Sequence, residues 1–471
     1  MKQPMKVYFL GIAGAGVSAL ASILVSEGHE VSGSDEAAFP PVSTYLDRLG
    51  VRYATSFSAA NVPADADVAI IGTSAKLHGA ENPELTEIKR RGIPHYTFAE
   101  YLGLHTKGRD NIVVAGSFGK STLTAMLAHM LVSAGRDPGW FIGAIPLDLD
   151  RTGNAGRDPQ MILEGDEYVV SMDDRRSKFE LYDVQHTLLS SIVHDHVNMF
   201  PTFESYVVPF RKLVDATPGV LVCARQYEAV REITVGRDVV WYGLGAGSGY
   251  CAEDIVIGEI TTFTLVTPKG EHVALETQLL GHHNIENIVG AAAMLLERGL
   301  VTGADLQRSV PAFRGVARRL DKKTVRSRVP VYEGFGSSYE KARSAIEAIQ
   351  LHFPTRPQVV VFEPHTFSWR NADALAWYDT VFEGVARVLV LPPPTHGAGG
   401  HHQLGFAEII DRVLAAGVDA SPAENADAVI ANLDATLKGD EVVLLLSSGP
   451  LDGLVDRLPP RMEERFGRLV R

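Results

Sequence analysis

Fully apolar runs of four or five residues recur along the chain, at residues 7–10, 68–72, 112–115, 359–362, 388–391 and 442–446. Such runs are typical of strands that are buried on both faces of a parallel sheet. Apolar residues at helical spacing fill the segments 17–26, 121–134, 203–216 and 284–298. The alternation of strands and helices predicts an α/β fold.

These elements group into three units, which we expect to be domains at residues 1–108, 109–316 and 317–471. The first has the strand, glycine turn and helix of a Rossmann-like domain. The second opens with a strand and a phosphate loop, as a P-loop ATPase does, and its short runs at 239–281 predict strands added to its sheet. The third follows a basic stretch at 314–328 and predicts another Rossmann-like, doubly wound domain.

Composition narrows the class of protein. The length of 471 residues fits roughly three domains. A net charge of −13 disfavours a basic surface for nucleic acid. The two cysteines exclude a disulfide scaffold and suit a reducing cytosol, so we expect a cytoplasmic protein. The uncharged segment 7–25 is open to interpretation as a membrane span, but its clustered glycines favour a strand, a turn and a helix, and we expect no membrane partner.

A phosphate loop is the strongest chemical motif. It lies between a strand and a helix and consists of Gly116, Ser117, Phe118, Gly119, Lys120, Ser121 and Thr122. Backbone N–H groups and the helix dipole at such a loop bind polyphosphate. Lys120 would reach the terminal phosphates and Ser121 would ligate Mg²⁺. The loop has two residues between its glycines instead of the usual four. Because it lies between a strand and a helix, the loop still predicts ATP binding.

A second glycine turn follows the first strand. It contains Gly11, Ala13, Gly14, Ala15 and Gly16, and Asp35 lies 19 residues after the last of these. The pattern resembles a dinucleotide-binding fingerprint, in which Ala13 replaces the middle glycine. An NAD-dependent dehydrogenase would leave Lys120 without a role. We therefore favour a nucleotide-linked substrate such as a UDP-sugar.

Acidic residues and histidines follow two further strands. Glu164, Asp166 and Glu167 follow one, and His194 and His196 follow the other. The carboxyl ends of neighbouring parallel strands meet at one crevice, so we expect these groups near the phosphate loop. Ser121 and Glu164 would hold Mg²⁺, and His196 would bind a second ion or phosphate. The alternative is that the histidines are ordinary polar residues at a strand end.

Two further pairs have a chemical and a structural interpretation. Asn284 and Asn287, at the start of a helix, would contact a purine or act as helix caps. Arg318 and Arg319 would reach phosphate when domains close, or would belong to a solvated basic linker.

Together these motifs resemble the Mur ligases, the ATP-dependent amide-forming enzymes of peptidoglycan precursor synthesis, over essentially the whole chain. The loop matches the family pattern Gly-[Thr/Ser]-X-Gly-Lys-[Thr/Ser], and residues 164–167 match Glu-Ala-Asp-Glu. Residues 195–196 match Asp-His, 283–287 match His-Asn-X-X-Asn and 318–319 match Arg-Arg. The segments 11–16 and 32–35 resemble the UDP-binding start of the family, which adds Ser34 and Asp35 to the UDP-sugar site.

The resemblance implies a three-domain architecture and a mechanism. ATP would phosphorylate the carboxylate of UDP-N-acetylmuramate, and the amine of an amino acid or peptide would displace the phosphate. Lys120, Glu164, His196 and Arg319 would be catalytic, and Ser121, Glu164 and His196 would ligate Mg²⁺. ATP would contact residues 116–122, Asn284, Asn287 and Arg319. We expect Lys120→Ala to abolish activity and leave the fold intact.

Within the family, residues 176–179 and 195–200 favour the murein peptide ligase branch, which adds L-Ala-γ-D-Glu-diaminopimelate, and the alternative branch adds L-alanine. At 333–339 the usual Asp-Asp and His-His have become Glu333-Gly334 and Ser337-Ser338. A noncatalytic or altered-substrate relative therefore stays open. A folylpolyglutamate-synthase-like ligase is disfavoured because that branch starts directly with the ATP domain. The oligomeric state is left open.

Overall fold

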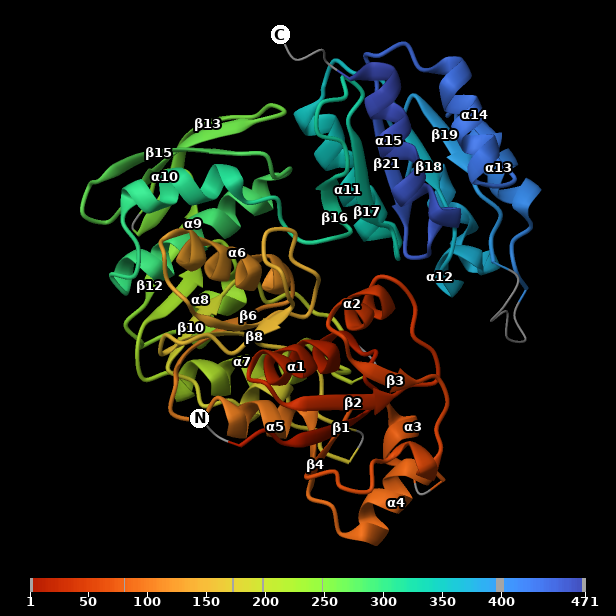
Figure 1. The fold of residues 1–471 in the computed structure, drawn as a ribbon. Helices are drawn as coiled ribbons and strands as arrows, with labels where there is room; N and C mark the ends of the chain where they lie inside the picture. Colours follow the sequence, from red (N-terminus) through yellow and green to blue (C-terminus); the bar gives the residue numbers. More distant parts are fainter. Residues whose placement is uncertain are drawn as a thin grey trace. The chain divides into compact units, whose positions relative to one another are not determined.

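The computed structural model describes six stretches of the chain, residues 3–79, 81–171, 173–196, 199–247, 249–394 and 402–467 (Figure 1). The chain divides into two compact units. The first comprises Met1–Ile255, Thr262–Thr277 and His283–Val316, and the second comprises Val256–Thr261, Gln278–His282 and Ala317–Arg471. The three-domain boundaries at residues 108 and 316 stay a prediction. No helix in the described stretches combines the length and the apolar character that crossing a bilayer requires.

The first sheet of the first unit is a five-stranded parallel sheet in the order β3-β2-β1-β4-β5. Its strands are β1 Lys6–Leu10, β2 Glu30–Ser34, β3 Arg52–Ala54, β4 Val68–Ile71 and β5 His95–Thr97. Its helices are α1 Ala15–Ser26, α2 Val42–Arg48, η1 Ala59–Asn61, α3 Ala75–His78, α4 Pro83–Arg91 and α5 Phe98–His105. The strand order reverses between β1 and β4, and in such sheets ligands bind in the crevice beyond the strands' carboxyl ends at this point.

A ten-stranded sheet forms the rest of the first unit, in the order β15-β14-β13-β12-β11-β10-β6-β9-β7-β8. Its strands are β6 Asp110–Ala115, β7 Gly139–Phe141, β8 Gly153–Asn154, β9 Gln160–Glu164, β10 His186–Leu189, β11 Leu221–Ala224, β12 Val240–Leu244, β13 Tyr250–Val256, β14 Thr261–Val266 and β15 His272–Thr277. Its helices are α6 Lys120–Ser133, η2 Lys178–Leu181, α7 Phe203–Ala216, α8 Glu228–Ile233, α9 His282–Glu297 and α10 Gly303–Ala312. The strands predicted at 239–281 do extend this sheet.

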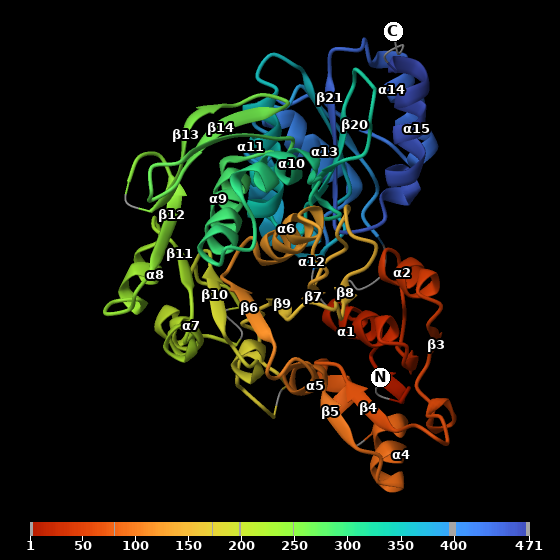
Figure 2. The same ribbon diagram turned by 60° about the vertical axis from the view of Figure 1, so that its left-hand side comes forward.

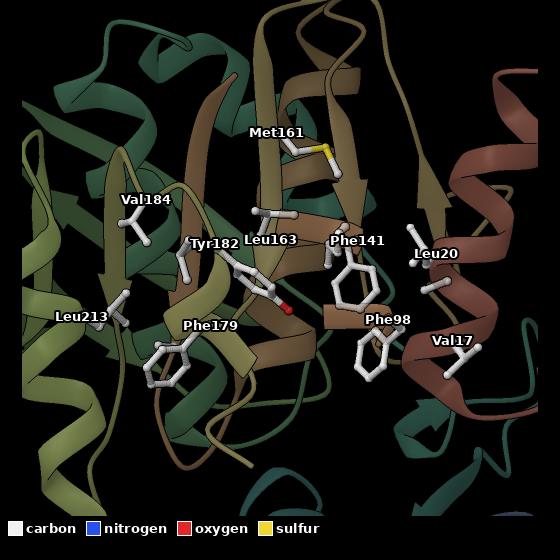
Figure 3. Close-up of a cluster of buried hydrophobic side chains, with 14 of the residues drawn as sticks. Val17, Leu20, Phe98, Phe141, Met161, Leu163, Phe179, Tyr182, Val184 and Leu213 are labelled. Carbon is white, nitrogen blue, oxygen red and sulfur yellow. The ribbon is translucent and has the colours of Figure 1, made fainter. Parts of the chain in front are cut away.

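Helix α1 joins the two sheets of the first unit. Its Ser22 hydroxyl donates to the carbonyl oxygen of Gly153 at 2.7 Å, and a Cβ on Gly153 would lie 2.0 Å from the carbonyl oxygen of Ala19. Figure 3 shows Val17 and Leu20 of α1 beside the Phe98 and Phe141 rings, and all four side chains are buried. These contacts pack helix α1, which covers the first sheet, against β7 and β8 of the ten-stranded sheet.

The second unit contains a six-stranded sheet in the order β16-β17-β21-β18-β19-β20. Its strands are β16 Arg319–Lys322, β17 Val331–Phe335, β18 Gln358–Phe362, β19 Arg387–Val390, β20 Ala420–Pro422 and β21 Val442–Ser447. Its helices are α11 Tyr339–His352, α12 Phe367–Arg370, η3 Ala372–Asp379, α13 Phe406–Ala415, α14 Ala426–Thr436, η4 Leu451–Gly453 and α15 Leu454–Phe466. Helices α11 and α13 cover one face and α14 and α15 the other (Figure 2). Part of the basic stretch 314–328 is β16, which pairs antiparallel with β17.

Candidate functional site

The glycine turn after β1 is closed by hydrogen bonds to the end of β2. The N–H groups of Gly11 and Ile12 donate to the carbonyl oxygen of Ser34 at 2.8 and 3.0 Å. The N–H of Ala13 donates to Oδ2 of Asp35 at 2.9 Å. Gly11 has a φ of +84°, a conformation that favours glycine. Asp35 therefore fixes the shape of the turn that leads into α1.

A cavity of about 410 Å³ extends from this turn to the ten-stranded sheet, which is the central sheet in the chain order. The lining residues from the first sheet and its loops are Gly11, Gly14, Ala15, Gly16, Val17, Asp35, Glu36, Phe57, Gly72, Thr73, Ser74, Lys76, Leu77 and Phe98. Those from the central sheet and its loops are Phe141, Gly143, Glu164, Asp166, Lys178 and Tyr182. The cavity thus brings the predicted UDP-sugar turn to the predicted magnesium ligand Glu164.

Two predicted UDP-sugar residues do not line this cavity. Ser34 is fully buried, and its hydroxyl donates to Oε2 of Glu84 at 2.5 Å. Strand β2 thus turns the Ser34 side chain into the protein interior, and the predicted part of Ser34 in the UDP-sugar site stays a prediction. The N–H of Ala13 is already bonded to Asp35, so this residue shapes the turn.

The phosphate loop is anchored to the segment that follows β10. The N–H of Ser117 donates to the carbonyl oxygen of Ser191 at 2.7 Å, and the N–H of Phe118 donates to its hydroxyl at 3.1 Å. A Cβ on Gly116, whose φ is +134°, would lie 2.1 Å from Ser190 Oγ. The N–H groups that begin α6 at Lys120 have no carbonyl partner within the helix, as at any helix start, and they favour an anion.

Lys120 forms an ion pair with a buried carboxylate. Its Nζ lies 2.7 Å from Oε2 of Glu167 and donates to the carbonyl oxygen of Gly116 at 2.7 Å. The Tyr206 hydroxyl donates to Oε1 of Glu167 at 3.2 Å, and Nε2 of His196 lies 3.6 Å from the same oxygen. Burial raises the pKa of Glu167, and the charge of Lys120 only partly opposes this. Glu167 therefore holds Lys120 at the mouth of the loop.

Glu164 contacts both the phosphate loop and the cavity. The Ser121 hydroxyl donates to its Oε1 at 2.7 Å, and the N–H of Gly143 donates to its Oε2 at 2.7 Å. The oxygens of Ser121 and Glu164 are of the kind that Mg²⁺ prefers, so this pair fits the predicted metal. His196 pairs with Glu167 instead, and no three His, Cys, Asp or Glu side chains in the described stretches are grouped as metal ligands. The role of His196 as a metal ligand stays a prediction.

Asp166 pairs with Lys178 at the same end of the cavity, with Nζ 2.6 Å from Oδ2. Burial acts to raise the pKa of Asp166, but the charge and hydrogen bond of Lys178 outweigh it and hold the pKa below its usual range. The ammonium group also lies over the rings of Phe98 and Tyr168, 5.4 and 5.5 Å from their centroids. The pair is therefore fixed in position, and the Asp166 carboxylate stays ionised at neutral pH.

Helix α9 brings the two predicted asparagines to the loop. A Cβ on Gly119 would lie 3.0 Å from Oδ1 of Asn287. The Nδ2 group of Asn287 donates to Oδ1 of Asn284 at 3.3 Å, and both side chains are buried. His194, by contrast, bonds through Nε2 to the carbonyl oxygen of Phe200 at 2.8 Å, as expected for an ordinary polar residue at a strand end.

The two arginines of the second unit differ in their surroundings. Arg318 donates to the carbonyl oxygens of Ser447 and Gly449 at 3.3 and 2.9 Å, and its Nε lies 3.3 Å from Oε1 of Glu333. The solvated-linker interpretation is therefore wrong for Arg318. Arg319 is exposed on β16, and its predicted contact with phosphate stays a prediction.

Two family models match the first unit. The model described as Mur ligase family, catalytic domain, matches residues 6–109, and the model described as Mur ligase middle domain matches residues 114–295. A UDP-N-acetylmuramate–L-alanine ligase of Chlorobium phaeobacteroides is 31% identical over 379 residues, 79% of each chain. The chain belongs to the Mur ligase family.

Solved structures share this fold. The UDP-N-acetylmuramate–alanine ligase of Thermotoga maritima has a TM-score of 0.80 at 22% identity and covers 98% of this chain and 99% of its own. A murein peptide ligase of Psychrobacter arcticus has a TM-score of 0.66 at 20% identity, covering 99% of this chain and 100% of its own. The predicted Mur ligase architecture is confirmed, and so is the enzyme class, an ATP-dependent ligase that forms amide bonds.

Sequence reasoning missed several residues of this Mur ligase site. Glu167 was visible in the acidic motif, but nothing in the sequence indicated that it pairs with Lys120. Lys178 belongs to the stretch 176–179, whose sequence favours one branch of the family but does not indicate that Lys178 pairs with Asp166. Phe141 and Tyr182 carried no sequence signal, since isolated aromatic residues are usual in a core. Residues 197 and 198 of the other branch-specific stretch lie outside the described residues.

Proposed function

We propose that this Mur ligase joins the carboxylate of UDP-N-acetylmuramate to the amine of L-alanine, with ATP as energy source, in peptidoglycan precursor synthesis. The observation that carries the proposal is the position of Glu164, which lines the cavity and accepts a hydrogen bond from Ser121 at the start of α6. A substrate with its diphosphate at the glycine turn and its carboxylate near Glu164 has that carboxylate beside the phosphate loop. The L-alanine ligases of C. phaeobacteroides and T. maritima support this acceptor.

The proposed chemistry has two steps. An oxygen of the substrate carboxylate attacks the γ-phosphorus of ATP, and ADP leaves. The amine nitrogen then attacks the carbonyl carbon of the acyl phosphate and loses a proton, and inorganic phosphate leaves. Lys120 and the N–H groups at the start of α6 bind and neutralise the phosphates. Bound Mg²⁺ would neutralise further charge, and Ser121 and Glu164 would supply its oxygen ligands.

The tripeptide L-Ala-γ-D-Glu-diaminopimelate is the second candidate acceptor. Residues 176–179 favour it, and the murein peptide ligase of P. arcticus has the same fold. Both acceptors present the amine of an L-alanine residue, so the reaction is the same. The two differ in whether the enzyme must bind the rest of a peptide.

The test is ADP release with Mg²⁺, ATP and UDP-N-acetylmuramate in the presence of L-alanine, the tripeptide or no amine, with Lys120→Ala as the inactive control. Turnover that depends on L-alanine supports the proposal, and turnover only with the tripeptide moves the acceptor to the second candidate. If the UDP-sugar binds but no amine gives turnover, the replacement of Asp-Asp and His-His at 333–338 marks a noncatalytic relative.

A further inference from the structure

Tyr182 is a buried tyrosine whose hydroxyl has no hydrogen-bond partner in the part of the chain that the structure describes. Only 7% of the residue is exposed. Buried hydroxyl groups are normally paired, because an unpaired one loses its bonds to water without replacement. Burial, and to a lesser degree the nearby carboxylates of Asp166 and Glu164, raise the pKa of Tyr182 well above its usual range. The group therefore stays protonated and available as a donor.

The hydroxyl lies in the wall of the cavity and is directed toward two of the rings in that wall. Tyr182 is one of the lining residues, and Figure 3 shows its oxygen directed toward the rings of Phe98 and Phe141, which line the same space. These two rings stack with their centroids 6.4 Å apart. Beside the Lys178 ammonium, which lies over the Phe98 ring, this part of the wall thus consists of apolar rings and the unpaired Tyr182 hydroxyl.

The lining of the cavity comes from two parts of the first unit. Asp35 and Phe57 belong to the first sheet and its loops, and Tyr182, Lys178 and Glu164 belong to the ten-stranded sheet and its loops. With the diphosphate at the turn and the reacting carboxylate near Glu164, as the proposed function requires, the sugar lies between Phe98, Phe141 and Tyr182. The acetamido group of that sugar combines a methyl group, which suits the rings, with a carbonyl oxygen, which needs a donor.

We propose that Tyr182 is a specificity-determining residue that donates a hydrogen bond to the acetamido carbonyl of the UDP-linked sugar. The assignment rests on the proposed function, since it requires a UDP-sugar in this cavity. The reacting lactyl carboxylate is assigned elsewhere, because its negative charge is better matched by the ammonium group of Lys178 than by a neutral phenol.

Calorimetric titration without ATP tests the assignment, with the unaltered protein and Tyr182→Phe. The three ligands are UDP-N-acetylmuramate, UDP-N-acetylglucosamine, which lacks the lactyl carboxylate, and UDP-glucose, which also lacks the acetamido group. We expect Tyr182→Phe to bind both acetamido sugars about threefold to tenfold more weakly, as for loss of one neutral hydrogen bond, and to bind UDP-glucose unchanged. Tyr242→Phe is the matched control, because Tyr242 is fully buried, its hydroxyl is likewise unpaired among the described residues, and it does not line the cavity.

Each other outcome overturns the assignment. Unchanged affinity for all three ligands, or equal weakening of all three, would make Tyr182 an ordinary core residue. Weakening confined to UDP-N-acetylmuramate would assign the hydroxyl to the lactyl carboxylate. A lower melting temperature of ligand-free Tyr182→Phe would show that the hydroxyl has a partner within the protein. If the unaltered protein binds UDP-glucose as tightly as the two acetamido sugars, only the Tyr182 assignment fails. If it binds none of the three ligands, the proposed function fails as well.

Discussion

Replacing Lys120 by methionine removes the cation that neutralises Glu167, whose side chain is 1% exposed. The carboxylate can then stay charged, and breaking a buried ion pair in this way costs about 3–5 kcal/mol. Alternatively it takes up a proton, which for a carboxyl group of ordinary pKa about 4.3 costs about 3.7 kcal/mol at pH 7. The protein adopts the less costly form, so we expect the free energy of unfolding to fall by at most about 4 kcal/mol at pH 7.

This loss depends on pH in a defined direction. Without Lys120, the pKa of Glu167 in the folded state rises further above its pKa in the unfolded state. At a pH between these two pKa values, Glu167 holds a proton in the folded state that it lacks in the unfolded state. The deficit relative to the unaltered protein therefore shrinks as the pH falls, to at most about 1 kcal/mol at pH 5. Urea denaturation at pH 7 and pH 5 measures both values. The sequence predicts that Lys120→Ala leaves the fold intact. Since this variant also lacks the Lys120 cation, its stability depends on the protonation of Glu167.

A double variant separates stability from activity. Lys120→Met with Glu167→Gln removes the buried charge, so we expect most of the stability at pH 7 to return and the pH dependence to disappear. ADP release should stay absent in both variants, because phosphate binding still lacks its cation. A deficit that is equal at pH 5 and pH 7, or that persists in the double variant, would refute the reasoning from buried charge. Turnover by Lys120→Met would refute the catalytic role.

Three further predictions rest on other parts of the structure. Gly116→Ala places a Cβ 2.1 Å from Ser190 Oγ, so we expect it to lower the free energy of unfolding by at least about 2 kcal/mol in urea denaturation. The control is Gly28→Ala, whose Cβ would have no heavy atom within 4 Å and which we expect to cost about 1 kcal/mol. Equal losses for the two variants would contradict the clash at Gly116. Glu164→Gln should raise the Mg²⁺ concentration for half-maximal ADP release by roughly tenfold, and an unchanged requirement would exclude Glu164 as a ligand. Burial lowers the pKa of His352, whose Nε2 accepts from the N–H of Gly281 at 2.7 Å, so stability should fall as the pH drops below about 6.5. In urea denaturation, His352→Gln should reduce the loss of stability between pH 7.5 and 5.5 by up to about 1 kcal/mol. If the variant loses as much stability as the unaltered protein, His352 is not the group that causes the loss.

The strands and motifs that have a local signal could be predicted from the sequence. The apolar strands β18 and β21 and the phosphate loop before α6 depend on neighbouring residues, so their positions follow from the pattern. Strand β16 could not be predicted, because Arg319–Lys322 is largely polar and gains its place by pairing with β17. The Ser121–Glu164 contact was foreseen because both residues follow strands of one sheet. Which carboxylate pairs with Lys120, and which aromatic rings line the cavity, depend on how distant segments pack.

The hydrogen bond between Ser121 and Glu164 would link the two proposed ligand sites thermodynamically. Any occupant of the phosphate loop that draws Ser121 or Glu164 into its own coordination changes the wall of the cavity that the UDP-sugar would contact. The coupling is reciprocal, so each ligand changes the affinity of the other by the same factor. An affinity measured for one ligand alone therefore differs from its affinity when the other ligand is bound. Titrating each ligand in the presence of the other measures this cooperativity directly.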